Sequence, residues 1–166
     1  MNEILNLNAH QEAEIRRAII ETATKLIGIK YETEEPSRPV WAGRGKWLDL
    51  SKIPKSLDCS GLVEGCYRSI GLAMPHGSSK QFDFTFPIGN GEAKVGDLAF
   101  FGREGKKDRI YHVGLVYDAT QIIESRAFDP NVSFETGKAI LRPRARWEAY
   151  GNFVGYRRHP KFHEQV

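Results

Sequence analysis

The sequence contains only two cysteines in 166 residues, and its uninterrupted apolar runs are only a few residues long. A membrane-spanning helix needs about 20 consecutive apolar residues, so we expect no insertion into a membrane. The formal net charge of +3 is too small to require a nucleic-acid partner. With 40% apolar residues and a length close to that of one typical domain, the chain is expected to fold as a single globular domain over residues 1–166.

Cys59 and Cys66 are not expected to form a disulfide. On one helix their Cα atoms would lie roughly 10 Å apart. A disulfide needs less than about 7 Å. The chain has no Cys-x-x-Cys pair, and no close pair of histidines before its C-terminal tail. We therefore expect neither a metal site nor a cofactor.

The predicted order of elements is two helices followed by several strands. Apolar residues recur every three or four positions over 10–28 and 59–70, where Gly28 and Gly71 end the helices. β-branched and aromatic residues favour strands, which we place at 95–101, 110–117, 121–127 and around 153–156. Residues 32–57, rich in proline and tryptophan, are expected to form a long structured loop. This order predicts an α+β fold with an antiparallel sheet.

Cys59 is the first candidate for chemistry, because it stands where the loop enters the second helix. Backbone N–H groups at a helix start lack intrahelical acceptors, and the helix dipole is positive there. Both features favour a thiolate, which is the nucleophilic form. The N–H groups of Cys59 and Ser60 could also bind an oxyanion. The alternative is a small buried cysteine with no chemical role, which is our interpretation of Cys66 in the middle of the helix.

A nucleophilic cysteine needs a base, and His112 is the best placed histidine because it lies on a predicted strand. Gly114 shares its face of the strand, and we expect open space over the imidazole there. The alternative is a core histidine with a structural role. His76, in a turn, is a weaker candidate, and His159 near the C-terminus is expected to be solvated.

Glu124 is the candidate for orienting the base. A hairpin around 118–120 would place either Glu124 or Arg126 opposite His112, and only the carboxylate can accept a hydrogen bond from the imidazole. The alternative is an ion pair between Glu124 and a neighbouring basic residue.

Five segments together resemble the motifs of one family. They are LIGIKY at 26–31, LDCSGLV at 57–63, MPHGS at 74–78, GDLAFF at 96–101 and HVGLVY at 112–117. In this order they are similar to the motifs of the NlpC-type cell-wall cysteine peptidases, a papain-like family, over residues 10–158. The resemblance implies a papain-like α+β fold, with N-terminal helices packed on a central antiparallel sheet.

The resemblance also implies hydrolysis of amide bonds in peptidoglycan stem peptides, often the bond from D-glutamate to diaminopimelate. Carried over, Cys59 is the nucleophile, His112 the base and Glu124 the third polar residue. Tyr31, Asp58 and Ser60 become candidates for binding a free stem-peptide amine, since a carboxylate suits an ammonium group.

The chain departs from the family pattern at two places. The third position usually holds His, Asn or Gln; a Glu124 anion would favour the His112 imidazolium and hence a Cys59 thiolate. The inserted loop 32–57 is longer than usual and is expected to edge the cleft.

Two other functions stay open. A non-catalytic phage-tail or assembly module could use the same fold, and a transferase could pass the acyl group to an amine or alcohol. The chain start lacks a basic segment followed by an apolar one, so no Sec signal peptide is expected. A cytoplasmic recycling enzyme, a phage-borne protein and a toxin exported by a dedicated machine therefore all fit. An inhibitor or phage-tail partner is an open expectation.

Overall fold

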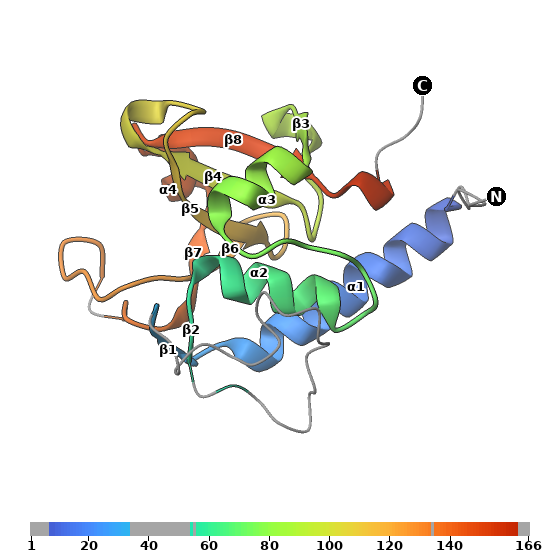
Figure 1. Ribbon diagram of the computed structural model, residues 1–166, viewed down its shortest axis with the longest axis horizontal. Helices are drawn as coiled ribbons and strands as arrows, with labels where there is room; N and C mark the ends of the chain where they lie inside the picture. The colour runs from blue at the N-terminus through green and yellow to red at the C-terminus, as the bar shows by residue number, and fades with distance from the viewer. Residues whose placement is uncertain (1–6, 34–53, 55, 134, 163–166) are drawn as a thin grey trace.

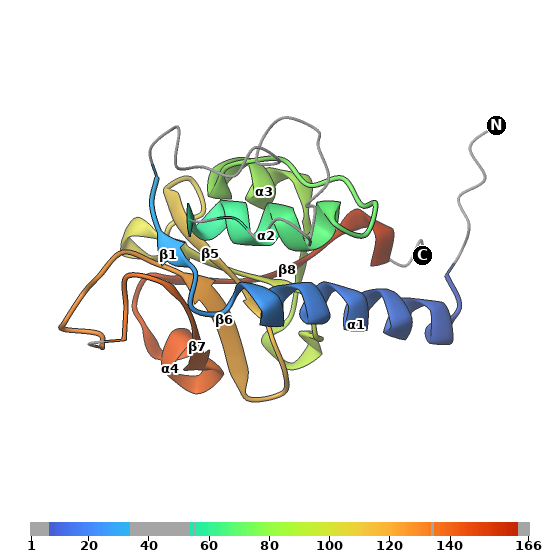
Figure 2. The same cartoon turned by 90° about the horizontal axis from the view of Figure 1, so that it is seen from below.

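The computed structural model describes residues 7–33, 54, 56–133 and 135–162. A six-stranded sheet forms the centre, with three helices on one face and a short helix on the other (Figures 1 and 2). The helices of the first face are α1 (Ala9–Leu26), α2 (Cys59–Arg68) and α3 (Ser78–Phe84). Helix α4 (Arg144–Ala149) covers the second face.

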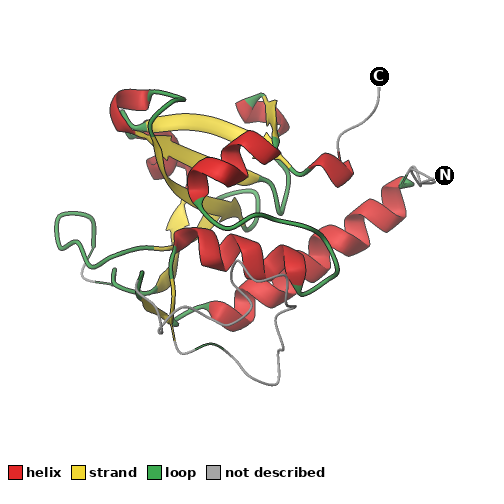
Figure 3. Cartoon of the chain, in the orientation of Figure 1, coloured by secondary structure: helices red, strands yellow, loops and turns green. Residues whose placement is uncertain are grey.

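The sheet has the strand order β3-β8-β4-β5-β6-β7, and every pairing in it is antiparallel. Its strands, coloured yellow in Figure 3, are β3 (Phe86–Ile88), β4 (Leu98–Gly102), β5 (Ile110–Val116), β6 (Gln121–Ser125), β7 (Ala139–Pro143) and β8 (Phe153–Arg158). A separate parallel pair joins β1 (Lys30–Tyr31) to β2 (Ser56–Leu57). The predicted α+β fold with an antiparallel sheet is confirmed.

Local sequence signals set both ends of α1. The side chain of Asn8 accepts a hydrogen bond from the Gln11 amide at 2.9 Å, and the Gln11 side chain accepts one from the Asn8 amide at 3.0 Å. This capping box satisfies backbone donors that have no partner within the helix. After α1 the chain turns at Gly28, whose φ of +88° is a conformation that glycine adopts easily.

Two hydrophobic cores lie on the two faces of the sheet. The larger core joins the apolar stripes of α1 and α2 to Val113 and Leu115 of β5. The smaller core, under α4, contains Phe101, Val116, Ile122, Trp147 and Tyr156. Alternation along β5 thus sends neighbouring side chains into different cores, as expected for a strand covered on both faces.

Asp97, within the Gly-Asp-Leu segment, joins the first helix to the last strand. Its fully buried carboxylate lies 2.9 Å from Arg16 Nη1 of α1 and 2.8 Å from Arg158 Nη2 of β8. Removing one partner from a buried ion pair leaves an uncompensated charge, so this motif residue has a structural role.

Several short elements were not predicted. Strands β3 and β7 lie at the two edges of the sheet and each contains a proline, Pro87 or Pro143. Edge strands tolerate proline because they need fewer backbone donors. The 3-10 turns are Asn90–Glu92, Arg103–Gly105 and Pro160–Phe162. Most of the loop predicted at 32–57 lies outside the described residues. Within the described part of the chain, no helix is long and apolar enough to cross a membrane.

Candidate active site

Cys59 is the first residue of α2, as the sequence predicts, and Asp58 caps this helix. The Asp58 carboxylate accepts a hydrogen bond from the Gly61 amide at 2.7 Å. Cys59 therefore stands in the first turn of a ten-residue helix, where backbone amides lack acceptors within the helix. Cys59 is unpaired and 9% exposed, whereas Cys66 is unpaired and completely buried. Burial raises the pKa of the Cys66 thiol, so this cysteine is held as a neutral core residue.

His112 meets Cys59 across a cavity of about 480 Å³ that both residues line. Cys59 is among the groups that raise the pKa of His112, so the thiol lies close enough to the imidazole to interact with it. Nε2 of His112 lies 2.8 Å from Glu124 Oε2, so Nδ1 is the ring nitrogen left for the sulfur. The sequence-predicted residues Cys59, His112 and Glu124 thus form one row.

Glu124 is fully buried, and two arginines face its other oxygen. Oε1 lies 3.1 Å from Arg142 Nη1 and 3.5 Å from Arg126 Nη1. The predicted contact with His112 and the alternative ion pair with a basic neighbour are therefore both present. Oε2 contacts the imidazole, and Oε1 contacts the two guanidinium groups.

These contacts perturb the ionisation of the row. Burial alone would lower the pKa of His112, but hydrogen bonds and charges from Cys59 and Glu124 outweigh it and raise that pKa to about 9. Burial would raise the pKa of Glu124, but His112, Arg126 and Arg142 outweigh it and lower that pKa. The geometry favours an imidazolium paired with the buried Glu124 carboxylate.

Trp147 of α4 is a site residue that the sequence did not reveal. Its ring stacks on His112, with centroids 5.4 Å apart, and on Phe101 at 4.5 Å. A Cβ placed on Gly114 would lie 2.8 Å from Trp147 Cη2, so glycine is needed for this approach. The open space expected over the imidazole beside Gly114 is therefore wrong, because Trp147 fills it.

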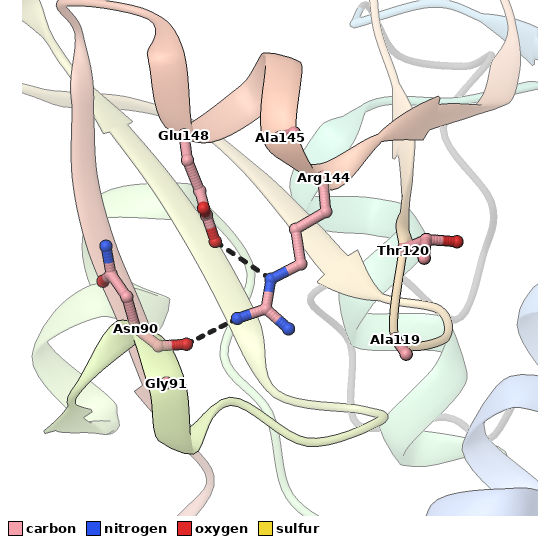
Figure 4. A pocket seen from close by; sticks show the side chains of 7 residues that line it. All are labelled: Asn90, Gly91, Ala119, Thr120, Arg144, Ala145 and Glu148. Atoms are coloured by element: carbon pink, nitrogen blue, oxygen red, sulfur yellow. Dashed lines mark hydrogen bonds and ion pairs between the residues drawn. The ribbon is translucent and has the colours of Figure 1, made fainter.

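Helix α4 is anchored by Arg144, as Figure 4 shows. The guanidinium points at Glu148 Oε1, 2.9 Å from Nε, and at the backbone oxygen of Asn90, 2.5 Å from Nη2. The Tyr156 hydroxyl lies 2.9 Å from the same Nε. Arg144, Glu148 and Asn90 line a second cavity of about 440 Å³ that has no lining residue in common with the first. Their mutual contacts hold α4, and with it Trp147, against the sheet.

Of the three residues predicted to bind substrate, one lines the cavity and two lie at the cap of α2. Tyr31 lines the cavity beside Cys59 and His112. Asp58 and Ser60 are nearly buried at the helix cap, where the Ser60 hydroxyl lies 3.4 Å from Asp58 Oδ1. Their roles in binding substrate remain predictions.

Two other histidines lie outside the row of site residues, although His76 Nε2 lies 3.8 Å from Asp58 Oδ2. His76 Nδ1 lies 2.9 Å from Oε2 of the buried Glu64, whose Oε1 lies 2.8 Å from Arg68 Nε. His159, expected to be solvated, is instead buried and stacked on Tyr67 with centroids 4.9 Å apart. Burial lowers the pKa of His159 to about 4, so it is a neutral core residue. Its charged sequence neighbours concealed this burial.

No group of three or more His, Cys, Asp and Glu side chains in the described ranges is arranged to hold a metal ion.

A cysteine at the start of a helix, facing a histidine on an antiparallel sheet, is the arrangement of the papain-like class. Within that class, the chain belongs to the NlpC/P60 family, whose family model matches residues 38–140. The family resemblance predicted from the five motifs is confirmed.

Known proteins of this family include several peptidoglycan enzymes. The chain is 30% identical over 142 residues to the peptidoglycan endopeptidase RipB of Mycobacterium tuberculosis, a match that covers 86% of this chain and 52% of RipB. It is 40% identical over 85 residues to the bifunctional muramidase/DL-endopeptidase CwlT of Bacillus subtilis, covering 51% of this chain and 26% of CwlT. The chain therefore spans about half the length of these relatives, or less.

Solved structures show the same fold. The peptidoglycan hydrolase RipB of M. tuberculosis superposes with a TM-score of 0.65 at 22% identity, covering 95% of this chain and 70% of that one. The P60 domain of an antigen from M. avium subspecies paratuberculosis also gives a TM-score of 0.65, at 18% identity, covering 91% of this chain and 98% of that one.

Proposed function

We propose that this chain is a cysteine peptidase that hydrolyses amide bonds in the stem peptides of peptidoglycan. The observation that carries the proposal is the row of Cys59, His112 and Glu124 at the edge of a cavity. RipB is named a peptidoglycan endopeptidase and CwlT a bifunctional muramidase/DL-endopeptidase, and both names support the substrate class.

In the first half of the reaction, the Cys59 thiolate attacks the carbonyl carbon of the amide and forms a carbon–sulfur bond. The carbonyl electron pair moves to oxygen, and the backbone N–H groups of Cys59 and Ser60 stabilise the oxyanion. The tetrahedral species then collapses, the carbon–nitrogen bond breaks, and the His112 imidazolium gives its proton to the departing amine. A thioester remains on Cys59.

In the second half, neutral His112 takes a proton from water as the oxygen attacks the thioester. The carbon–sulfur bond breaks, the acid product leaves, and the sulfur returns as a thiolate beside the imidazolium. Glu124 holds the imidazole throughout, because its Oε2 accepts from Nε2 at 2.8 Å and keeps Nδ1 turned toward the sulfur.

The finer proposal is cleavage of the bond from D-glutamate to diaminopimelate, with a free stem-peptide amine bound by Tyr31, Asp58 and Ser60. Tyr31 lies on the cavity wall, and Asp58 supplies a carboxylate one residue before the nucleophile. A carboxylate and an aromatic hydroxyl suit an ammonium ligand. The setting stays as proposed from the sequence: cytoplasmic, phage-borne or exported by a dedicated machine. An inhibitor or phage-tail partner fits the last two.

Digestion of purified peptidoglycan, followed by mass spectrometry of the soluble products, tests this function. We expect the wild type to release fragments with new termini within the stem peptide, and Cys59→Ala to release none. Cys66→Ala is the matched control, since it removes a buried thiol outside the row and should leave the products unchanged. A folded wild type that yields no fragments from any stem-peptide chemistry would instead favour the non-catalytic module. Products joined to an added amine, at the expense of hydrolysis, would favour the transferase.

A further inference from the structure

The two oxygens of the Glu124 carboxylate contact different groups. Oε2 accepts from His112, and Oε1 lies 3.1 Å from Arg142 Nη1. Arg142 comes from β7, which pairs with β6 so that Arg142 stands opposite Ile122, two residues from Glu124. This diagonal lets a long side chain reach along the sheet face to the carboxylate.

Arg142 is held firmly in that position. Its side chain is 7% exposed, and its guanidinium carbon lies 5.5 Å from the centre of the Tyr150 ring. Nη2 donates toward the Tyr150 hydroxyl at 3.4 Å. Arg126, by contrast, is 21% exposed, lies 3.5 Å from the same Glu124 oxygen, and shares its guanidinium with Asp129 at 3.8 Å. Arg142 is thus the closer and more buried partner.

A buried carboxylate in direct contact with the base creates an electrostatic problem. An unpaired anion buried there would tend to become protonated, and its carboxylic acid could then no longer serve His112 as an ionised acceptor. A cation on the opposite oxygen keeps the carboxylate ionised and limits its field at His112.

We propose that Arg142 is a positioning residue, which acts through Glu124: it orients the carboxylate, keeps it ionised and offsets its charge at His112. The pair Glu124–Arg142 then replaces a single neutral acceptor as the third member of the row. The part of this inference that is tested by kcat/KM rests on the proposed cysteine-hydrolase function.

The charged and titratable groups around the row come from every element packed against it. They are Tyr31 from β1, Cys59 from α2, Tyr111 from β5, Arg126 and Asp129 after β6, Arg142 from β7 and Tyr150 at the end of α4. Within this set, Arg142 is a cation with its side chain more than nine-tenths buried, which is why its loss should be felt at Glu124.

The first test is the pH dependence of Cys59 alkylation by iodoacetamide in folded Arg142→Met. Without the cation, the pKa of the buried Glu124 should rise. The acid limb of the pH profile, where the alkylation rate falls as the pH is lowered, should then move to higher pH by about one unit. Arg146→Met is the control: it removes an equal charge from an exposed residue that lines a neighbouring small cavity with Arg142, and it should leave the limb in place. A limb that does not move in Arg142→Met would overturn the proposal.

The second test is reciprocal rescue. In Glu124→Gln the amide has one acceptor oxygen for two donors, His112 and Arg142, so the change leaves one donor without an acceptor. In Glu124→Gln with Arg142→Met, the amide oxygen can serve His112 alone. We expect kcat/KM of the double variant to exceed that of Arg142→Met by about tenfold at mildly acidic pH. This is the gain expected when the acid limb of the kcat/KM profile moves back toward its wild-type position by about one pH unit. Losses that simply multiply would mean that Arg142 only supports the fold.

The two tests separate this inference from the proposed function. Alkylation needs no peptidoglycan, so the first test gives a result even if the chain cleaves none. If the wild type cleaves peptidoglycan while Arg142→Met matches it at every pH, the positioning role fails and the peptidase stands. Thermal melts of each variant establish that the measured protein is folded.

Discussion

Nε2 of His112 and Oε2 of Glu124 lie 2.8 Å apart, in a contact where the carboxylate is completely buried. The distance is that of a charge-assisted hydrogen bond, which is stronger than a neutral one. It fixes which nitrogen of His112 meets Cys59. In the proposed mechanism, the acid–base chemistry of His112 therefore depends on a carboxylate that need not contact substrate.

Replacing Glu124 by Gln is expected to reduce activity less than replacing His112 by Ala. The amide still offers an acceptor to the imidazole, whereas alanine removes the proton carrier altogether. Steady-state kcat/KM on a stem-peptide substrate measures both. Equal losses would mean that the negative charge of Glu124, and not only its hydrogen bond, is required.

The activity should have an alkaline limit set by His112. Its pKa is raised to about 9, so the imidazolium needed to protonate the leaving amine is lost as pH rises through that value. In Glu124→Gln an anion is removed from beside the ring, so the pKa should fall and the alkaline limb should move to lower pH. A pH profile of kcat/KM for both proteins checks this; a limb that moves upward would contradict the direction.

The raised pKa of His112 also has a consequence for stability. It is higher in the folded state than the usual value near 6.5, so the contribution of His112 to the free energy of unfolding is complete below that value. This contribution is then lost as pH rises through about 9. Urea unfolding of wild type and His112→Gln across this range should show their difference shrinking with rising pH. A constant difference would argue against the ion pair.

Gly114→Ala should disturb both the fold and the site. A Cβ there would lie 2.8 Å from Trp147 Cη2 and 2.9 Å from the Ile123 backbone oxygen. Overpacking of this kind typically costs about 1–3 kcal/mol, and here it would push the indole off His112. Gly91→Ala is the matched control, because its Cβ would meet nothing within 4 Å. Thermal melts and peptidase rates of the two variants decide the matter; equal behaviour would contradict the close approach.

Asp97→Asn is expected to destabilise the fold without altering the chemistry at Cys59. The carboxylate lies between Arg16 and Arg158 and is fully buried, so the amide would leave buried cations poorly paired, at a cost of about 3–5 kcal/mol. Asp118→Asn, in an exposed turn, is the control. Chemical unfolding gives the stabilities. A loss confined to peptidase activity would place Asp97 in the site instead of the fold.

Local patterns were sufficient to predict the long elements and the row of site residues. Helical periodicity and the glycine stops placed α1 and α2 to within one or two residues of their observed ends, and β5 and β6 follow from runs of β-branched residues. Spacing across a short turn made Glu124 a neighbour of His112. Cys59 and His112 were joined by the need of a nucleophile for a base and by the resemblance of the five motifs.

What the sequence could not supply depends on contacts between distant segments. Trp147 reaches His112 from a six-residue helix 35 positions further along, and the short β7 that carries Arg142 gives only a weak periodic signal. The solvated position predicted for His159 is wrong because its charged neighbours hide the fact that its own ring packs on Tyr67. Such tertiary partners have no signature in the local pattern.

The central claim of the proposal is that His112 activates Cys59 as a nucleophile, and thiol labelling tests it most directly. Wild type and His112→Ala are treated with iodoacetamide at mildly acidic pH, and the labelled cysteine is located by mass spectrometry. We predict fast labelling of Cys59 in the wild type, slow labelling in His112→Ala, and no labelling of the buried Cys66 in either folded protein. Equally slow labelling of Cys59 in both proteins would contradict the account.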